Sequence, residues 1–250
     1  MHEFVASAPC NLEALKANSY PGRIVAGRLD ESGKYFMLGS AIMGRSHNSR
    51  NRVYRQDGCR VYTDLFEPDP KANTVLTVYN AMNEWGPHWV ASNGDQTDTV
   101  VEFLKQGKLS TEALQTRTYE PDAPNYTPRI TAVIQIDPLR LTLSRICKLQ
   151  NAEDAKEHAL HEHYDYYYAR AQMPPGITWC LQTYEGDSKG ELPSYRGKPY
   201  SLPLKGGMEE VADTLWSALN VDNRVGLAIK FIEIASGKSS VTLRNKHLGD

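Results

Sequence analysis

A proline-rich stretch, TYEPDAPNYTPRITAVI at residues 118–134, constrains the fold more than any other part of the sequence. Its prolines, Pro121, Pro124 and Pro128, exclude both the interior of a helix and a central strand. From Ile130 onward the stretch is apolar and predicts a buried strand. We therefore expect a rigid polar loop that leads into the core, an arrangement that can hold reactive groups in place.

Polar side chains crowd this loop: Tyr119, Glu120, Asp122, Asn125, Tyr126 and Arg129. They are candidates for a binding or catalytic site. The alternative is that the loop is a stiff connector whose acids are simply solvated, and the stretch alone leaves both interpretations open.

Composition narrows the class of protein. The chain has 250 residues, 40% of them hydrophobic, and a net charge of −2, which argues against a general nucleic-acid binder. No apolar run approaches the ~20 residues of a membrane helix, and no secretory signal is visible. The four cysteines are too widely spaced for a zinc ribbon or a redox pair, so we expect reduced thiols in a cytoplasmic protein.

Alternating and apolar patterns predict a strand-rich chain with helices between and after hairpins. We expect strands over residues 23–29, 34–44, 59–66, 74–82, 88–94, 130–136, 139–149, 176–184, 224–235 and 240–245. We expect helices over residues 12–17, 94–108, 110–119, 152–172 and 208–220. This order predicts one α+β domain over residues 1–250, with antiparallel sheets and helices on their outer faces. Residues 1–20 are predicted to be an N-terminal extension, and the loop over residues 185–207 is long enough to cover a site.

Two polar clusters lie outside the proline-rich stretch. Residues 45–55 hold four arginines and a histidine without an acid, so the segment is either a phosphate-binding loop or a solvated basic one. Residues 152–172 hold His158, His161 and His163 among several tyrosines. A metal site there is conceivable, but no H-E-x-x-H pattern is present, and we favour an exposed helix or a tyrosine-rich interface.

The chain resembles the archaeal-type inosine monophosphate cyclohydrolases in several motifs. They are GRIVAGR (22–28), Asn51-Arg52, VYNAM (78–82), VASNGDQTDTV (90–100) and YEPDAPNYTPRITA (119–132), with a fainter match at QTYEGD (182–187). The combination is specific, whereas each motif alone is weak. Residues 1–20, the histidine- and tyrosine-rich segment 152–172 and the C-terminal end depart from the archaeal pattern, and we interpret 152–172 as an insertion.

The resemblance implies a four-layer α-β-β-α sandwich of two antiparallel sheets, similar to the N-terminal-nucleophile hydrolases. Members of that superfamily usually expose a processed nucleophile at the mature N-terminus. Here position 2 is His2, and Cys10 lies in the extension. We therefore predict neither self-processing nor a terminal nucleophile.

The resemblance also implies a reaction, closure of the second purine ring on a formamido ribonucleotide, which needs no metal or redox cofactor. The residues it assigns to catalysis are Arg52, Tyr79 and Glu120. The predicted substrate-binding residues are Arg23, Arg45, Asn93, Asn125 and Arg129, and for Arg129 a structural tie to the loop is an equal alternative. The expected partner is a purine ribonucleotide substrate, with neither nucleic acid nor membrane bound.

Two other functions stay open. An amide hydrolase would need a nucleophile in the cleft, such as Cys59 or Ser92. A non-catalytic module would bind purine nucleotides without converting them. Tyr164 and residues 166–168 would suit an interface, so we expect a homo-oligomer.

Overall fold

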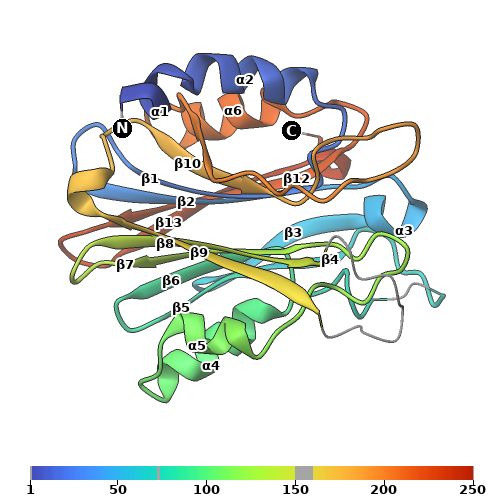
Figure 1. Ribbon diagram of the computed structural model, residues 1–250, viewed down its shortest axis with the longest axis horizontal. Helices are drawn as coiled ribbons and strands as arrows, with labels where there is room; N and C mark the ends of the chain where they lie inside the picture. The colour runs from blue at the N-terminus through green and yellow to red at the C-terminus, as the bar shows by residue number, and fades with distance from the viewer. Residues whose placement is uncertain (1, 72–73, 150–159, 250) are drawn as a thin grey trace.

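Two antiparallel sheets stack face to face in the computed structural model, which describes residues 2–71, 74–149 and 160–249 (Figure 1). The first sheet has the strand order β11-β10-β1-β2-β12-β13. Its strands are β1 (Arg23–Leu29), β2 (Tyr35–Met43), β10 (Thr178–Gln182), β11 (Tyr200–Leu202), β12 (Arg224–Glu233) and β13 (Ser239–Asn245).

The second sheet runs β3-β4-β5-β6-β7-β8-β9 in sequence order, so each strand pairs with its neighbour in the chain. Its strands are β3 (Arg52–Asp57), β4 (Arg60–Leu65), β5 (Asn80–Trp85), β6 (His88–Ser92), β7 (Arg129–Gln135), β8 (Arg140–Lys148) and β9 (His161–Ala169).

Helices cover the outer face of each sheet. On the first sheet lie α1 (His2–Ala6), α2 (Ala8–Ala17) and α6 (Met208–Ala218), and on the second lie α4 (Gln96–Lys105) and α5 (Ser110–Gln115) (Figure 1). The short helix α3 (His47–Arg50) joins β2 to β3, and 3-10 turns occupy Arg170–Gln172 and Lys246–Leu248. The expected α+β layered sandwich is therefore confirmed. Within the described residues, no helix combines the length and the apolar character that a membrane crossing requires.

The alternation of side chains along each strand separates the core into layers. On β1, Val25 joins the cluster between the two sheets, whereas its neighbours Ile24 and Ala26 face α2 and α6. A smaller cluster lies between the second sheet and α4, around Val100 and Val133. The sheets approach closely at Gly27, where an added Cβ would lie 2.8 Å from the Cδ1 atom of Leu141 on β8. Because the sheets share one core, residues far apart in sequence are held rigidly together.

Most predicted elements are confirmed, and the hairpins β1–β2, β7–β8 and β12–β13 have the expected partners. The predicted strand over 74–82 is wrong in its first part. Backbone bonds from Thr77 and Val78 to the carbonyl of Thr74 make a turn there, and β5 begins only at Asn80. The arginine-rich segment 45–55, expected as a loop, instead contains α3 and the start of β3.

The predicted helix over 152–172 is also wrong for the residues described. β9 pairs with β8 along its whole length, from Lys148 opposite His161 to Arg140 opposite Ala169. The physical reason is a period of two: Tyr166 and Tyr168 pack on the core between the sheets. Residues 150–159, which include His158, lie outside the described part of the chain.

Candidate active site

A cavity of about 570 Å³ opens where the start of β1, the segment after β2 and the proline-rich loop before β7 meet. Charged and phenolic side chains form much of its wall, namely Tyr20, Arg23, Arg45, Glu120, Asp122 and Tyr184. A space of this size accommodates a small-molecule ligand, and its polar wall favours a charged one.

Glu120 is a buried carboxyl in this wall, only 1% exposed. Its backbone N–H donates to the carbonyl of Thr127 at 2.9 Å, and its Oε1 accepts a hydrogen bond from Asn93 Nδ2 at 3.2 Å. Burial raises the pKa of Glu120 to about 7, although Arg23 and Arg129 favour the charged form. A carboxyl with this pKa is partly ionised near neutral pH and can both accept and donate a proton.

Arg23, the first residue of β1, brings a cation to the same wall. Burial opposes its charge, but Tyr20, Glu120 and Tyr184 favour it, and the pKa of the guanidinium is raised. Its Nε is buried and has no hydrogen-bond partner among the described residues. A buried cation with an unpaired N–H is well suited to a negatively charged group on a ligand.

Arg52 and Tyr79 lie behind this wall, because neither is among the residues that line the cavity. Arg52 is fully buried and donates to two backbone carbonyls, at 2.9 and 3.1 Å. Its Nη1 and the Tyr79 hydroxyl are buried and form no hydrogen bond of ordinary geometry with any described residue. Burial raises the pKa of Tyr79, and the charges of Arg52 and Arg23 partly offset the effect. Both side chains also act on Glu120 or Arg23, so the predicted catalytic residues gather in one buried cluster.

Asn93 supports Glu120 from the end of β6. Its Nδ2 donates to Glu120 and to the carbonyl of Pro128, at 3.2 and 2.9 Å. Its Oδ1 accepts from the N–H of Ile130 at 2.8 Å and from Gln96 Nε2 at 2.9 Å. The side chain is 1% exposed, and its hydrogen-bonding groups are directed inward. This geometry suits a residue that positions Glu120 better than one that contacts a ligand.

Arg129 is likewise directed into the protein. It donates to the carbonyl of Thr118 at 2.9 Å, and its Nη1 lies 2.7 Å from both Asp95 Oδ1 and Gln96 Oε1. These bonds tie the proline-rich loop to the start of α4. Of the two roles expected for Arg129, this geometry favours the structural tie.

Arg45 and Asn125 reach the cavity, as expected for candidate binding residues. The Nη1 of Arg45 pairs with Asp187 Oδ2 at 2.7 Å, and its guanidinium lies 5.3 Å from the centre of the Tyr20 ring. Asn125 is exposed at the tip of the proline-rich loop. The predicted site residues therefore divide into four that line or enter the cavity (Arg23, Arg45, Glu120 and Asn125) and four behind it (Arg52, Tyr79, Asn93 and Arg129).

Comparison with protein families shows which family the chain belongs to. The family described as IMP cyclohydrolase-like protein matches residues 20–237. The chain belongs to the IMP cyclohydrolase-like family. A comparison with proteins of curated function gives no significant match.

The IMP cyclohydrolase-like match contains every residue of the cavity wall, from Tyr20 to Leu192. It begins after α1 and α2, so these helices lie outside the matched part. That residues 1–20 form an N-terminal extension stays a prediction.

The sequence did not identify two phenols of the wall, Tyr20 and Tyr184, as site residues. Tyr184 shares a hydrogen bond of 2.5 Å with the hydroxyl of Thr127, which also donates to Asp122. The QTYEGD motif contained Tyr184 and was the available signal. Tyr20 lies two residues before the first matching motif, and nothing in its spacing marked it.

The nucleophiles considered for an amide hydrolase lie elsewhere. Ser92 is fully buried, and its hydroxyl bonds to the carbonyl of Gly94 at 2.8 Å and to Thr97 Oγ1 at 2.6 Å. Cys59 is exposed at the turn between β3 and β4. Neither residue lines the cavity.

Metal ligation was also considered from the sequence. Among the described residues, no group of three or more His, Cys, Asp or Glu side chains is placed to hold a metal ion. His163 on β9 instead lies 3.1 Å from Asp165.

Proposed function

We propose that this IMP cyclohydrolase-like protein closes the second purine ring, converting 5-formamidoimidazole-4-carboxamide ribonucleotide to inosine monophosphate with loss of water. The observation that carries the proposal is a buried carboxyl, Glu120, whose pKa of about 7 suits proton transfer, in a cavity beside the Arg23 guanidinium. Membership of the family supports the substrate class.

The first step joins the two reacting groups of one substrate. The carboxamide nitrogen attacks the formyl carbon, a C–N bond forms, and the formyl oxygen becomes an oxyanion. Ionised Glu120 accepts the proton that the nitrogen loses. Because both groups belong to one molecule, holding them in contact supplies much of the acceleration.

Tyr79 is proposed to protonate the oxyanion. Its raised pKa keeps the phenol protonated at neutral pH, and its hydroxyl is buried beside Arg52 without a hydrogen bond of ordinary geometry to any described residue. Arg52 and Arg23 stabilise the negative charge that develops. The resulting hydroxyl then leaves as water with a proton from Glu120, and a C=N bond forms as the former formamide nitrogen gives its proton to the Tyr79 phenolate. Both side chains thereby return to their starting protonation states.

Two residues of the cavity wall, Arg45 and Asn125, are proposed to hold the ribonucleotide phosphate. A guanidinium fork matches phosphate oxygens, so Arg45 is the main candidate and would exchange its Asp187 contact for the phosphate.

A cyclisation assay tests the proposal. Purified protein is mixed with the formamido ribonucleotide, without added metal, and the absorbance of the hypoxanthine ring is followed. We expect turnover, with Glu120→Gln lowering kcat by about 10²- to 10⁴-fold and Tyr79→Phe by about 10²- to 10³-fold.

Two control variants make the same chemical changes, loss of a carboxylate charge and loss of a phenol hydroxyl, at residues that do not line the cavity. Glu191→Gln removes an exposed acid, and Tyr62→Phe removes a phenol on β4. Both are expected to keep wild-type rates. If the wild-type protein does not turn over the substrate, the proposed reaction is wrong. If wild type and Glu120→Gln react at the same rate, the role proposed for Glu120 is wrong.

A further inference from the structure

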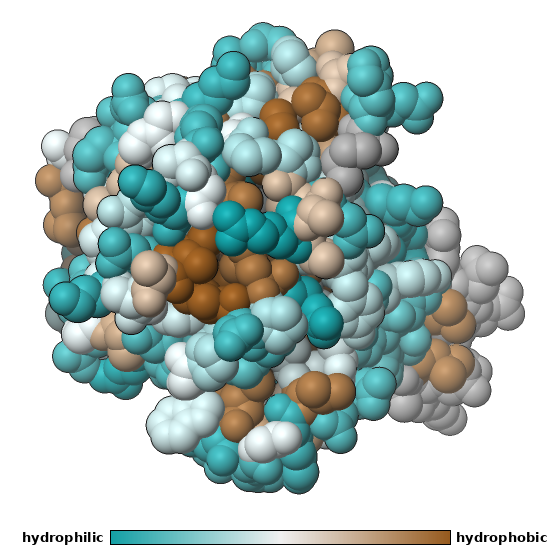
Figure 2. Space-filling model, turned by 90° about the vertical axis from the view of Figure 1, so that its left-hand side faces the viewer, coloured by the Kyte–Doolittle hydropathy of each residue, from teal (hydrophilic) through white to brown (hydrophobic). Residues whose placement is uncertain are grey.

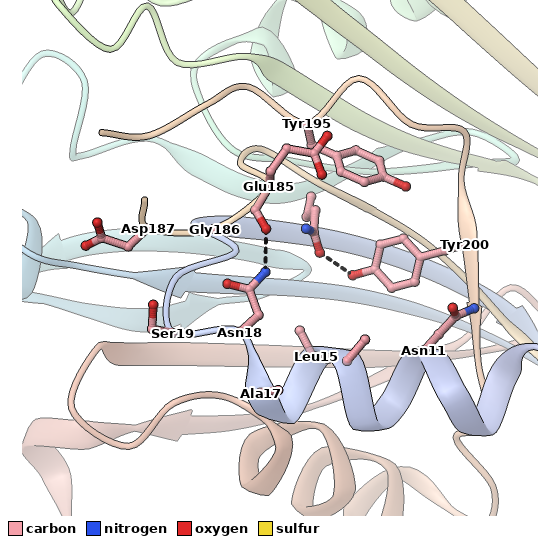
Figure 3. A pocket seen from close by; sticks show the side chains of 12 residues that line it. Asn11, Leu15, Ala17, Asn18, Ser19, Glu185, Gly186, Asp187, Tyr195 and Tyr200 are labelled. Atoms are coloured by element: carbon pink, nitrogen blue, oxygen red, sulfur yellow. Dashed lines mark hydrogen bonds between the residues drawn. The ribbon is translucent and has the colours of Figure 1, made fainter. Parts of the chain in front are cut away.

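A second cavity, of about 590 Å³, lies next to the first, between α2 and the segment that follows β10. Figure 3 shows Asn11 and Leu15 of α2 on one side of it and Tyr195 and Tyr200 on the other. In the proposed ring closure no residue of this wall contacts the substrate, and Asp187, the partner of Arg45, links the two cavities. The family match begins at residue 20, so the part of the cavity wall that α2 forms lies outside the matched region.

The charge of the residues that line the α2 cavity disfavours an anionic ligand. The residues that line it include the carboxylates Glu185 and Asp187 but no lysine, arginine or histidine. Asp187 is already paired with Arg45, whereas Glu185 takes part in no ion pair within the described residues. A phosphate or carboxylate would meet uncompensated negative charge here.

Unused hydrogen-bond acceptors lie in the same wall. Asn11 donates from Nδ2 to the carbonyl of Ser201 at 3.0 Å, but no described residue donates to its Oδ1. The Oε1 of Glu185 accepts from the backbone N–H of Arg196 at 3.1 Å, and its Oε2 accepts from no described residue. The cavity thus offers acceptors, and it suits a ligand that donates hydrogen bonds.

Aromatic and apolar groups complete the wall. The rings of Tyr195 and Tyr200 pack edge to face with their centres 6.1 Å apart, and Leu15 with two alanines of α2 lies across from them. Phenol rings attract cations through their faces, and the apolar side contacts hydrocarbon.

We propose that the α2 cavity binds a small organic cation, one that carries amino or amidinium donors on an aromatic or apolar body. Glu185 supplies the counter-charge, Asn11 accepts a hydrogen bond, and the tyrosine rings and Leu15 contact the body of the ligand. The site is separate from Glu120 and does not depend on the proposed ring closure.

Calorimetric titration with three probes of similar shape tests whether the α2 cavity prefers a cationic ligand. Benzamidine is a cation, benzamide is neutral and benzoate is an anion. We expect benzamidine to bind most tightly, benzamide more weakly and benzoate not at all. Glu185→Gln should weaken benzamidine by about five- to tenfold, because the carboxylate is exposed. Glu191→Gln, on the same segment but outside the wall, should bind as the wild type does.

Two further variants locate the ligand. Ala14→Trp fills the cavity and should abolish binding, whereas Glu13→Trp, on the same turn of α2 but outside the wall, should not. Glu120→Gln should leave benzamidine affinity unchanged. The proposal is overturned if wild-type protein binds no benzamidine at millimolar concentration, or if benzoate binds equally well. It is also overturned if Glu120→Gln, and not Glu185→Gln, weakens binding.

Discussion

At the scale of the residue, the proposed chemistry depends on the pKa of one carboxyl group, that of Glu120. Glu120 is removed from water, which disfavours its charge, yet Arg23 and Arg129 lie near enough to favour that charge. Burial is the larger effect, so the pKa of Glu120 is raised from 4.5 to about 7 in spite of the two cations. Two measurable consequences follow, one for the rate and one for stability.

The first prediction concerns the pH dependence of the rate. If Glu120 acts as the base, only its ionised form is active, and kcat/KM should increase with pH up to about 7 and then level off. Rates measured between pH 5 and 9 check this, and Tyr79→Phe should be slower but keep the same rise. If kcat/KM does not change with pH below 7, a group other than Glu120 accepts the proton.

The second prediction concerns the free energy of unfolding. The pKa of Glu120 rises from 4.5 to about 7 on folding, so the folded state keeps the proton to higher pH than the unfolded chain. Its contribution to stability is full below pH 4.5 and is lost as pH rises through 7. Glu120→Gln should therefore gain stability relative to wild type between pH 4.5 and 8, by up to about 3 kcal/mol. Urea unfolding at several pH values measures the gain, and an equal difference at every pH contradicts it.

The sequence identified residues of the candidate site more readily than it identified the partners that orient their side chains. Glu120 and Arg23 stand in motifs, and both line the cavity. The inward direction of Asn93 and Arg129 depends on partners that are distant in sequence, such as Asp95, which directly precedes α4 and contacts Arg129. No local pattern encodes such a contact, so residue type alone could not separate positioning from binding.

At the scale of the element, the corner between β6 and α4 holds the proline-rich loop. Asn93 bonds to the loop at Glu120 and Pro128 and to the first turn of α4 at Gln96. Three elements thus meet at one buried amide. A loop without regular structure is rigid here because its hydrogen bonds end on a helix and two strands.

The third prediction tests this corner. Asn93→Ala leaves several buried groups unpaired and should lower stability by about 2–4 kcal/mol. It should also lower kcat more than it changes KM, since Glu120 loses its orientation. Asn80→Ala, which removes exposed bonds to Asp98, is the matched variant and should have a small effect. Unchanged kcat in folded Asn93→Ala would limit the residue to a structural role.

The sequence predicted the strand hairpins correctly but assigned β9 to a helix. Its local composition, rich in His, Glu and Tyr, does not separate the two periods well. The deciding interaction is the ladder with β8, where for example Leu143 lies opposite Tyr166. Tertiary pairing of this kind overrides a weak local preference.

At the scale of the whole molecule, two sheets and their outer helices enclose the core in four layers (Figure 1). That the chain forms a single domain stays a prediction, as does its likeness to the N-terminal-nucleophile hydrolases. One end of the sandwich, on the left of Figure 1, has apolar residues gathered in a hollow with hydrophilic residues around it (Figure 2). Exposed apolar patches of this kind often serve as contact surfaces.

The fourth prediction is that the protein is a homo-oligomer whose interface includes Tyr164 and Tyr167 on β9, which are 46% and 52% exposed. Light scattering should give a mass above that of one chain, and the double variant Tyr164→Ser, Tyr167→Ser should reduce it. Tyr35→Ser removes another exposed tyrosine, on β2, and should leave the mass unchanged. A wild-type mass of 28.0 kDa contradicts the prediction.

The ion pair between Arg45 and Asp187 joins the two cavities, because each partner lines a different one. A phosphate that attracts Arg45 away from its partner leaves Asp187 with an unbalanced negative charge facing the α2 cavity. A cation bound there compensates that charge and in turn releases Arg45. A phosphate in the first cavity and a cation in the α2 cavity should therefore increase each other's affinity by the same factor, as reciprocity requires. The two sites would be coupled through the breaking of one surface ion pair.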